Sequence, residues 1–404
     1  MSISLGKRLV AAAAAAAIIA PLAAQAEDVK IGFLGGLTGP IESLVPPILE
    51  AAKLAAKNVN DQGGIVGGQK LMVSAGDTTC ADATAAANSA DRLVNSEKVT
   101  AIVGALCSGA TISSANNAAI PGNVVMVSPA STSPAITTLK DKDLVYRLVP
   151  SDSYQGQMLA KLLLSKGLST IAISYVNNDY GKGFADSLAK AFVDQGGTVS
   201  GKEAHEEGKA DYRAELGSLA SGGAETLVVL AYANGSGQTV IRQAIEGGDF
   251  ANFAGGDGLV ADELIAAIGA DAAKDLITTK PGASDVPGTK IFNEMAAASG
   301  IDPKAIFVQQ GYDSAFLLAL AIEKSGSADR AGIAKALRQV SSAPGEVILP
   351  GEWKKAVAAI KAGKDINYEG ASGSHEFDAN GDVPGVIVEM KVSGSTFVQV
   401  GVVK

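Results

Sequence analysis

The sequence has few of the residues on which catalytic chemistry most often depends. Its 404 residues include only two histidines, His205 and His375, and a single tryptophan, Trp353. Both histidines stand among charged or Gly- and Ser-rich residues that are typical of a surface, and the G-x-S-x-G motif of many serine hydrolases is absent. We therefore expect a protein that is not an enzyme and that needs neither a cofactor nor a resident metal.

Basic residues and long apolar runs are also scarce. The chain has 33 Lys and Arg against 42 Asp and Glu, a formal net charge of −9. An acidic chain of this kind argues against binding to nucleic acid or to an anionic membrane. After the first 26 residues no segment approaches the roughly 20 apolar residues of a membrane helix. We expect a protein that is free in solution.

The first 26 residues have the pattern of a secretory signal. Lys7 and Arg8 precede an apolar segment, residues 9–20, and a small-x-small pattern follows at Ala24 to Ala26. We expect cleavage after Ala26. No cysteine near that point offers a lipid anchor, so export without an anchor is consistent with a Gram-negative periplasm.

Cysteine is nearly absent, with only Cys80 and Cys107 in the whole chain. In an oxidising compartment an even number of cysteines most simply forms disulfides, and two unpaired buried thiols are the alternative. A disulfide between them would tether the loop that carries Ser108.

Beyond the signal, short apolar runs alternate with amphipathic stretches. Runs at 29–34 and 99–105 each precede a helical pattern, a further run at 124–127 leads into a loop, and a fresh alternation begins near residue 154. This order predicts an α/β fold with parallel sheets. The chain is too long for one ordinary core, so we expect two lobes. The first would hold residues 27–148 and 277–345, and the second residues 149–276 and 346–404.

Small hydroxylated residues follow two of these apolar runs. Ser108 comes after the run at 99–105, near the start of a predicted helix, and Ser131 and Thr132 come after the run at 124–127. Backbone N–H groups at a helix start, together with hydroxyls, favour a bound anion such as a carboxylate. Any one hydroxyl could instead cap a helix or form a turn. The two loops together indicate a carboxylate site.

Polar residues follow the apolar runs of the second half as well. Tyr180, Tyr232 and Asp257 come after predicted strands. Ligands of open parallel sheets bind beyond the carboxyl ends of the strands. We expect these three residues to face the hydroxylated loops across a cleft, where Asp257 suits a cation.

Two further features have simple structural interpretations. Residues 378–382 with Glu389 superficially mimic a calcium loop, but Val383 stands where such loops carry Gly, which favours an Asn-Gly turn. We expect Trp353 to serve packing on an amphipathic helix rather than to form a ligand platform.

These motifs, in this order, resemble the type I periplasmic solute-binding proteins of ABC importers, specifically the leucine/isoleucine/valine-binding branch. The resemblance covers most of the mature chain. Its most specific motifs are LCSGAT at 106–111 and SPASTSP at 128–134, supported by DYGKG at 179–183 and GGDG at 255–258. It implies two Rossmann-like lobes joined by a three-crossover hinge.

The resemblance also implies roles for individual residues. Ser108, Ser131 and Thr132 would hold a ligand carboxylate, and Tyr180 and Tyr232 would close over the ligand. Asp257 would hold an α-ammonium group at a place where branched-chain binders usually carry Glu. Cys80 and Cys107 match the family disulfide.

The function implied is that of the periplasmic substrate-binding component of an ABC transporter. Such a protein, expected to be a monomer, captures a small amino acid, branched-chain or other neutral aliphatic, and delivers it to an inner-membrane permease and its ATPase. Leu44, Tyr154 and a long segment at 341–382 depart from the branched-chain pattern. The alternatives are another carboxylated or amide solute (an aromatic acid, a short amide or urea), or a ligand-presenting sensor.

Overall fold

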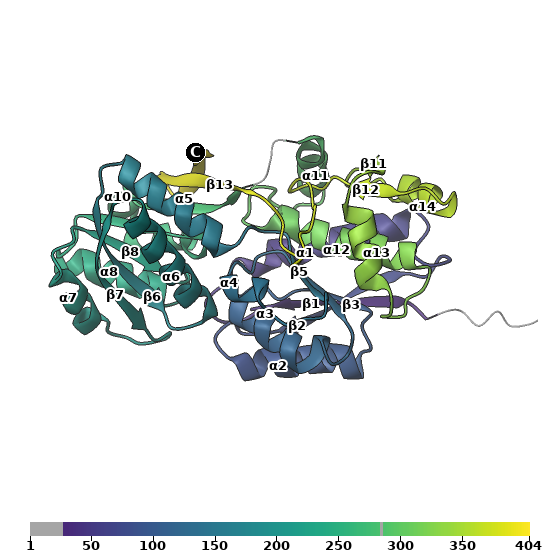
Figure 1. The fold of residues 1–404 in the computed structure, drawn as a ribbon, viewed down its shortest axis with the longest axis horizontal. Helices are drawn as coiled ribbons and strands as arrows, with labels where there is room; N and C mark the ends of the chain where they lie inside the picture. Colours follow the sequence, from purple (N-terminus) through teal and green to yellow (C-terminus); the bar gives the residue numbers. More distant parts are fainter. Residues whose placement is uncertain (1–26, 283–285) are drawn as a thin grey trace, which may run out of the picture.

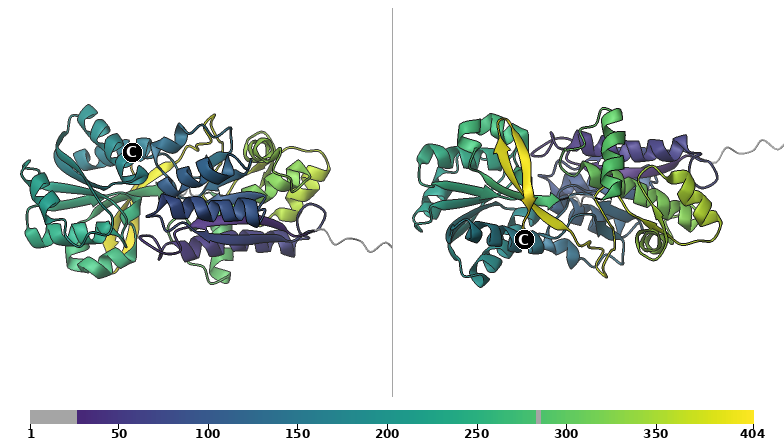
Figure 2. Two further views of the ribbon diagram at one scale, coloured as in Figure 1. Left: turned by 90° about the horizontal axis from the view of Figure 1, so that it is seen from below. Right: turned by 90° about the horizontal axis from the view of Figure 1, so that it is seen from above.

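Two β-sheets organise the chain, and helices flank each of them (Figure 1). The computed structural model describes residues 27–282 and 286–404, so the predicted signal segment, residues 1–26, lies outside the described residues. Figure 2 shows the two sheets in two lobes, one beside the other along the long axis of the molecule.

The first sheet has five parallel strands in the order β2-β1-β3-β4-β5. Its β3 and β4 are buried throughout, the pattern of strands covered by helices on both faces. The strands are β1 (Val29–Gly35), β2 (Leu71–Asp77), β3 (Ala101–Gly104), β4 (Val125–Ser128) and β5 (Val145–Arg147). The helical elements between them are α1 (Val45–Asp61), α2 (Ala83–Asp91), η1 (Arg92–Ser96), α3 (Ser108–Ser114), η2 (Ala115–Ala119) and α4 (Pro134–Thr137).

The second sheet has seven strands in the order β14-β13-β10-β9-β8-β6-β7. Strands β6 to β10 are parallel, and β13 pairs antiparallel with β10 and β14. The strands are β6 (Thr170–Val176), β7 (Thr198–His205), β8 (Thr226–Leu230), β9 (Asn252–Gly255), β10 (Ile277–Gly282), β13 (Val386–Ser393) and β14 (Thr396–Val402). The helices are α5 (Asp152–Ser165), α6 (Asp179–Asp194), α7 (Arg213–Ala220), α8 (Ser236–Gly247), η3 (Asp257–Leu259), α9 (Asp262–Ile268) and α10 (Ala270–Ala273). The two sheets confirm the predicted α/β fold.

A third group of elements packs against the first sheet. Its central helix, α12 (Val308–Ser325), is buried along almost its whole length, as expected of a helix that is apolar on most sides. A Cβ on Gly311 would lie 2.7 Å from Cγ2 of Ile48, so only glycine lets α12 approach α1 this closely. The other elements are α11 (Pro287–Ala298), α13 (Ile333–Ser341), β11 (Glu346–Ile348), α14 (Trp353–Lys361) and β12 (Ile366–Tyr368).

The lobe boundaries expected from the sequence need two corrections. Residues 277–282 were expected in the first lobe, but they form β10, which pairs with β9 and β13 of the second sheet. Residues 346–368 were expected in the second lobe, but they pack on the first. Trp353 is fully buried there, because its indole contacts Phe316 of α12 and its Nε1 donates to the Gly64 carbonyl at 3.0 Å. The predicted packing role of Trp353 is thus confirmed.

The predicted disulfide is also present in the structure. The Cα atoms of Cys80 and Cys107 are 5.6 Å apart, and the bond joins the loop after β2 to the residue before α3. Within residues 27–282 and 286–404, no helix is both long and apolar enough to cross a membrane.

A buried carboxylate holds the loop that follows β12. Asp313 of α12 is fully buried and accepts hydrogen bonds from the Tyr368 hydroxyl at 2.6 Å, the Ala371 N–H at 2.9 Å, the Ser372 N–H at 2.7 Å and His375 Nε2 at 3.2 Å. Burial raises its pKa, but the bonds from His375, Ser372 and Tyr368 outweigh burial and hold the pKa below the usual value. The ionised form of Asp313 is therefore the one that the fold stabilises.

We predict that Asp313→Asn lowers the free energy of unfolding by about 3 kcal/mol at pH 7, because an amide turns donors toward the N–H groups that the carboxylate accepts from. Since the pKa of Asp313 is lowered on folding, its contribution is complete above the unfolded pKa of about 4 and is lost as the pH falls through the folded value. Urea unfolding at several pH values checks this. Equal stabilities of the two proteins at pH 7 would contradict it.

Candidate functional site

The two hydroxylated loops lie side by side, as the sequence predicts, because β3 and β4 are neighbouring parallel strands. The Ser133 N–H donates to Oγ of Ser108 at 3.2 Å, and the hydroxyls of Thr111 and Ser131 are 2.7 Å apart. The helix expected near residue 108 is α3, and Ser108 is its first residue. The polar atoms of both loops thus form one wall.

A cavity lies against this wall, and Ser108 and Thr132 both line it. Ser131 is not among its lining residues. The Ser131 hydroxyl bonds Thr111 and lies 3.1 Å from the Ala105 carbonyl, and its N–H donates to Ser128 Oγ at 3.0 Å. Ser131 therefore stabilises the loop by hydrogen bonds within the first lobe. Direct ligand contact by Ser131 stays a prediction.

Tyr180, Tyr232 and Asp257 line the opposite side of the same cavity. Tyr180 lies in the first turn of α6 and stacks on Tyr232, with ring centroids 5.1 Å apart. The Tyr180 hydroxyl donates to Oδ1 of Asp257 at 3.2 Å and accepts from the Gly258 N–H at 3.0 Å. These bonds fix the direction of both the phenol and the carboxylate. The structure thus brings five of the six predicted residues together around one cavity.

Apolar side chains complete the cavity, and sequence reasoning missed most of them. Leu44, which departs from the branched-chain pattern, lines the cavity together with Phe307, the residue just before α12. No local motif marks Phe307 as a cavity residue. A second cavity, of about 710 Å³, adjoins the first and shares Leu44 and Phe307 with it. The apolar residues of the first cavity that bear on ligand shape are Ile41, Leu44, Ile48, Leu106 and Phe307.

Near Asp257 lie two buried polar residues that the sequence did not reveal, Asp152 and Gln155. Gln155 Nε2 donates to Oδ1 of Asp257 at 3.1 Å. Both carboxylate oxygens of Asp152, Oε1 of Gln155 and the Thr132 hydroxyl have no hydrogen-bond partner within the described residues. Buried polar atoms are rarely left unpaired, so this region is suited to a ligand that brings donors.

Burial also changes the acidity of the two carboxyl groups. Burial and the nearby charge of Asp257 raise the pKa of Asp152 well above its usual value. Burial likewise raises the pKa of Asp257 to about 6, although the bonds from Tyr180 and Gln155 and the charge of Lys280 work in the opposite direction. Because burial raises both pKa values, a cation that enters the cavity beside Asp257 would stabilise the charged form of this pair.

The two lobes touch around the cavity, so the structure is closed. The Ser133 hydroxyl donates to the Asp179 carbonyl at 2.8 Å, and Asn234 Nδ2 donates to the Ser43 hydroxyl at 2.6 Å. At Gly183 of α6 a Cβ would lie 2.8 Å from Cδ of Pro134, so a larger residue would hold the lobes apart. A ligand in the cavity would contact both lobes.

The histidines need a correction, because both are buried rather than at the surface. His205 lies between the hydroxyls of Ser174 and Ser236, at 2.8 Å and 3.0 Å, and burial lowers its pKa to about 4. His375 bonds Asp313. Neither histidine lines the cavity.

Known proteins resemble this chain in sequence and in structure. A family model described as periplasmic binding protein matches residues 28–366. A leucine-, isoleucine-, valine-, threonine- and alanine-binding protein from Pseudomonas aeruginosa is 32% identical over 81% of this chain and 86% of that protein. A chemotactic signal transduction system substrate-binding protein from Halobacterium salinarum is 30% identical over 87% of this chain and 84% of that protein. The crystal structure of a leucine binding protein from Thermotoga maritima is 27% identical, with a TM-score of 0.79 over 93% of this chain and 99% of that one.

We predict that reduction of the Cys80–Cys107 disulfide lowers the free energy of unfolding by at most about 3.6 kcal/mol, because it frees a loop of 27 residues in the unfolded chain. Thermal unfolding with and without a reductant measures this. Since the chain has no other cysteine, the reductant has no second target, and Cys80→Ser with Cys107→Ser serves as the matched variant. A transition that reductant leaves unmoved would contradict the prediction.

Proposed function

This chain belongs to the type I periplasmic solute-binding proteins, in the family of the leucine/isoleucine/valine-binding proteins, and we propose that it binds a small neutral amino acid with an aliphatic side chain. Like the other members of that family, it is a binding protein rather than an enzyme. The observation that carries the proposal is one cavity with hydroxyls on one side, a buried acid on the other and apolar side chains between them. Those three features match a carboxylate, an ammonium group and an aliphatic side chain.

Each lining residue then has a role in the proposed complex. Ser108 and Thr132 hold the ligand carboxylate, and Asp257 pairs with the α-ammonium. Tyr180 orients Asp257 through its hydroxyl, and Tyr232 stacks on Tyr180 to close the second-lobe side. The side chain of the ligand lies against the apolar residues around Leu44 and Phe307.

Lobe closure supplies the mechanism of capture. A ligand that contacts residues of both lobes stabilises the closed state by the contacts that it makes only there. In this proposal, Ser108 and Thr132 bind from the first lobe and Asp257 from the second. The closed protein, a monomer in the periplasm after cleavage at Ala26, would deliver the amino acid to an ABC permease and its ATPase.

A sensor that presents its ligand to a membrane receptor is the second candidate. The chemotactic relative from Halobacterium salinarum favours it, since that protein covers a similar share of this chain. Both candidates use the same cavity and the same closure, so they differ in the membrane partner and not in the ligand chemistry.

We predict that Asp257→Asn weakens binding of L-leucine by roughly 100-fold at pH 7.5, because the ammonium group loses a buried, charge-assisted partner. In the unaltered protein, affinity should fall toward tenfold per pH unit below about pH 6, since a proton then competes with the ammonium for Asp257. Isothermal titration calorimetry from pH 5 to pH 7.5 measures both effects.

Asp271→Asn is the matched control, because Asp271 is an exposed acid on α10 of the same lobe and the substitution removes the same charge. Its affinity should equal that of the unaltered protein. Equal affinity in Asp257→Asn would instead remove Asp257 from the ligand site.

A further inference from the structure

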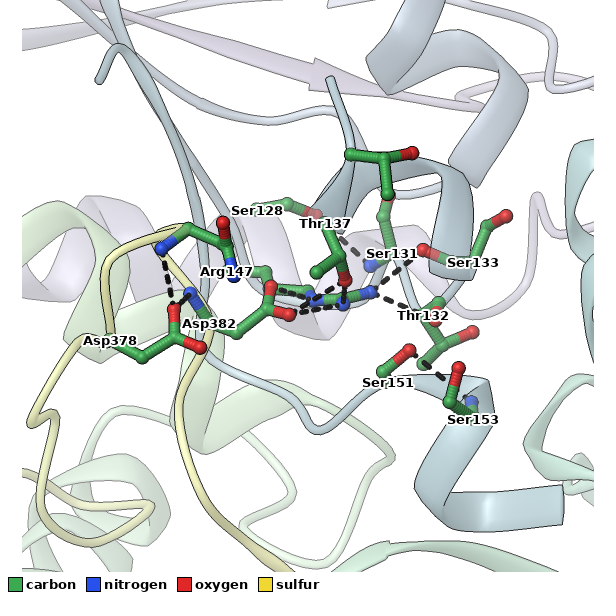
Figure 3. A network of polar contacts seen from close by, with 12 residues as sticks. Ser128, Ser131, Thr132, Ser133, Thr137, Arg147, Ser151, Ser153, Asp378 and Asp382 are labelled. Carbon is green, nitrogen blue, oxygen red and sulfur yellow. Dashed lines mark hydrogen bonds and ion pairs between the residues drawn. The ribbon is translucent and has the colours of Figure 1, made fainter. Parts of the chain in front are cut away.

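Arg147 is a fully buried arginine at the end of β5, where the chain leaves the first lobe (Figure 3). Its Nε and Nη2 donate to the two carboxylate oxygens of Asp382 at 2.7 Å and 2.8 Å, and Nη2 also donates to the Thr137 hydroxyl at 2.6 Å. Its Nη1 donates to the carbonyls of Thr132 and Ser133 at 2.8 Å and 2.9 Å. All five N–H groups of the guanidinium thus have acceptors.

One end of this network is the hydroxylated loop of the cavity. The Thr132 carbonyl accepts from Arg147 and also from the Asp152 N–H at 2.8 Å. Because a peptide unit is planar, a Thr132 carbonyl directed at Arg147 turns the Ser133 N–H the opposite way. That N–H bonds Oγ of Ser108. Because Ser108 Oγ is the acceptor in this bond, its own O–H remains able to donate to a ligand in the cavity.

The other end is the turn at 378–382, on the segment that returns from β12 to β13 in the second sheet. Oδ1 of Asp378 accepts from the N–H groups of Asn380 and Asp382 at 2.7 Å and 3.0 Å, which makes the segment a turn, as predicted. The Arg147 N–H donates to the Gly381 carbonyl at 3.1 Å. The first and third connections between the lobes are therefore joined at one point.

We propose that Arg147 and Asp382 are positioning residues for the carboxylate subsite: the pair orients the Thr132–Ser133 peptide, and through it the Ser108 hydroxyl, and ties both to the turn at 378–382. The inference rests on the proposed function, in which Ser108 and Thr132 hold the ligand carboxylate. Two of the five guanidinium N–H groups act on carbonyls of the loop that lines the cavity, so a change at Arg147 reaches the ligand side of that loop.

The test is the affinity of Arg147→Lys and Asp382→Asn for L-leucine, L-isoleucine and L-valine by calorimetry. A lysine has one nitrogen and cannot serve Asp382, Thr137 and two carbonyls together. We expect roughly 10-fold or greater weakening, by the same factor for all three ligands, because the carboxylate subsite is common to them. Ser108→Ala should cost less affinity in the Arg147→Lys background than alone, since both act through one hydroxyl.

Asp313→Asn is the control for a purely structural effect. Asp313 is an equally buried charge in an equally bonded network, but it lies outside the cavity. It should lower stability and leave affinity unchanged, whereas Arg147→Lys lowers affinity. Asp382→Asn, which keeps one acceptor oxygen, provides the folded variant where Arg147→Lys does not fold.

Three outcomes overturn the inference. Unchanged affinity in folded Arg147→Lys or Asp382→Asn would show that the pair serves stability alone. A loss that differs among the three amino acids would place the effect in the apolar part of the cavity. An unaltered protein that binds none of the three would overturn the proposed function together with this inference, whereas the first two outcomes leave the proposed function intact.

Discussion

The parallel pairing of β3 with β4 is the contact on which the site depends. Neighbouring parallel strands end at the same edge of a sheet, so the loops that carry Ser108 and Thr132 have to meet. The Ser133 N–H donates to Ser108 Oγ and so joins the two loops, and Arg147 donates to the carbonyl of the same Thr132–Ser133 peptide. The disulfide anchors the same edge, since Cys107 directly precedes α3. A flexible hydroxylated loop becomes a fixed wall by these means.

The opposite side of the cavity places an acid where water has little access. Asp257 is held by Tyr180 and Gln155, and its burial makes the charged form costly even though the charge of Lys280 acts in the opposite direction. Asp152 lies close by with no partner for its carboxylate oxygens among the described residues. In the proposed complex an ammonium group would relieve this cost, and the same ligand would contact first-lobe residues in the closed structure, which would couple binding to closure.

How much of the fold and of the site can be predicted from the sequence depends on whether a feature arises from residues that are close together in the chain. Apolar runs predicted buried strands such as β3 and β4, and the hydroxyls after these two runs predicted one wall of the cavity. The edge strand β7 escaped prediction because its residues are mostly half-buried and it has no apolar run. Phe307, Gln155 and Arg147 act through contacts with residues far away in sequence, and no local pattern marks such contacts. The same reason explains the misplaced lobe boundaries, since β10 is assigned by its pairing and α14 by the burial of Trp353.

In the proposed complex, one cavity recognises a carboxylate and an ammonium group at the same time. The most direct measurement is calorimetry with L-leucine, with 4-methylpentanoate, which lacks the ammonium, and with 3-methylbutylamine, which lacks the carboxylate. We expect that leucine binds and that each analogue binds at least about 100-fold more weakly, because each leaves buried polar groups without a partner. Binding of 4-methylpentanoate as tight as that of leucine would contradict it.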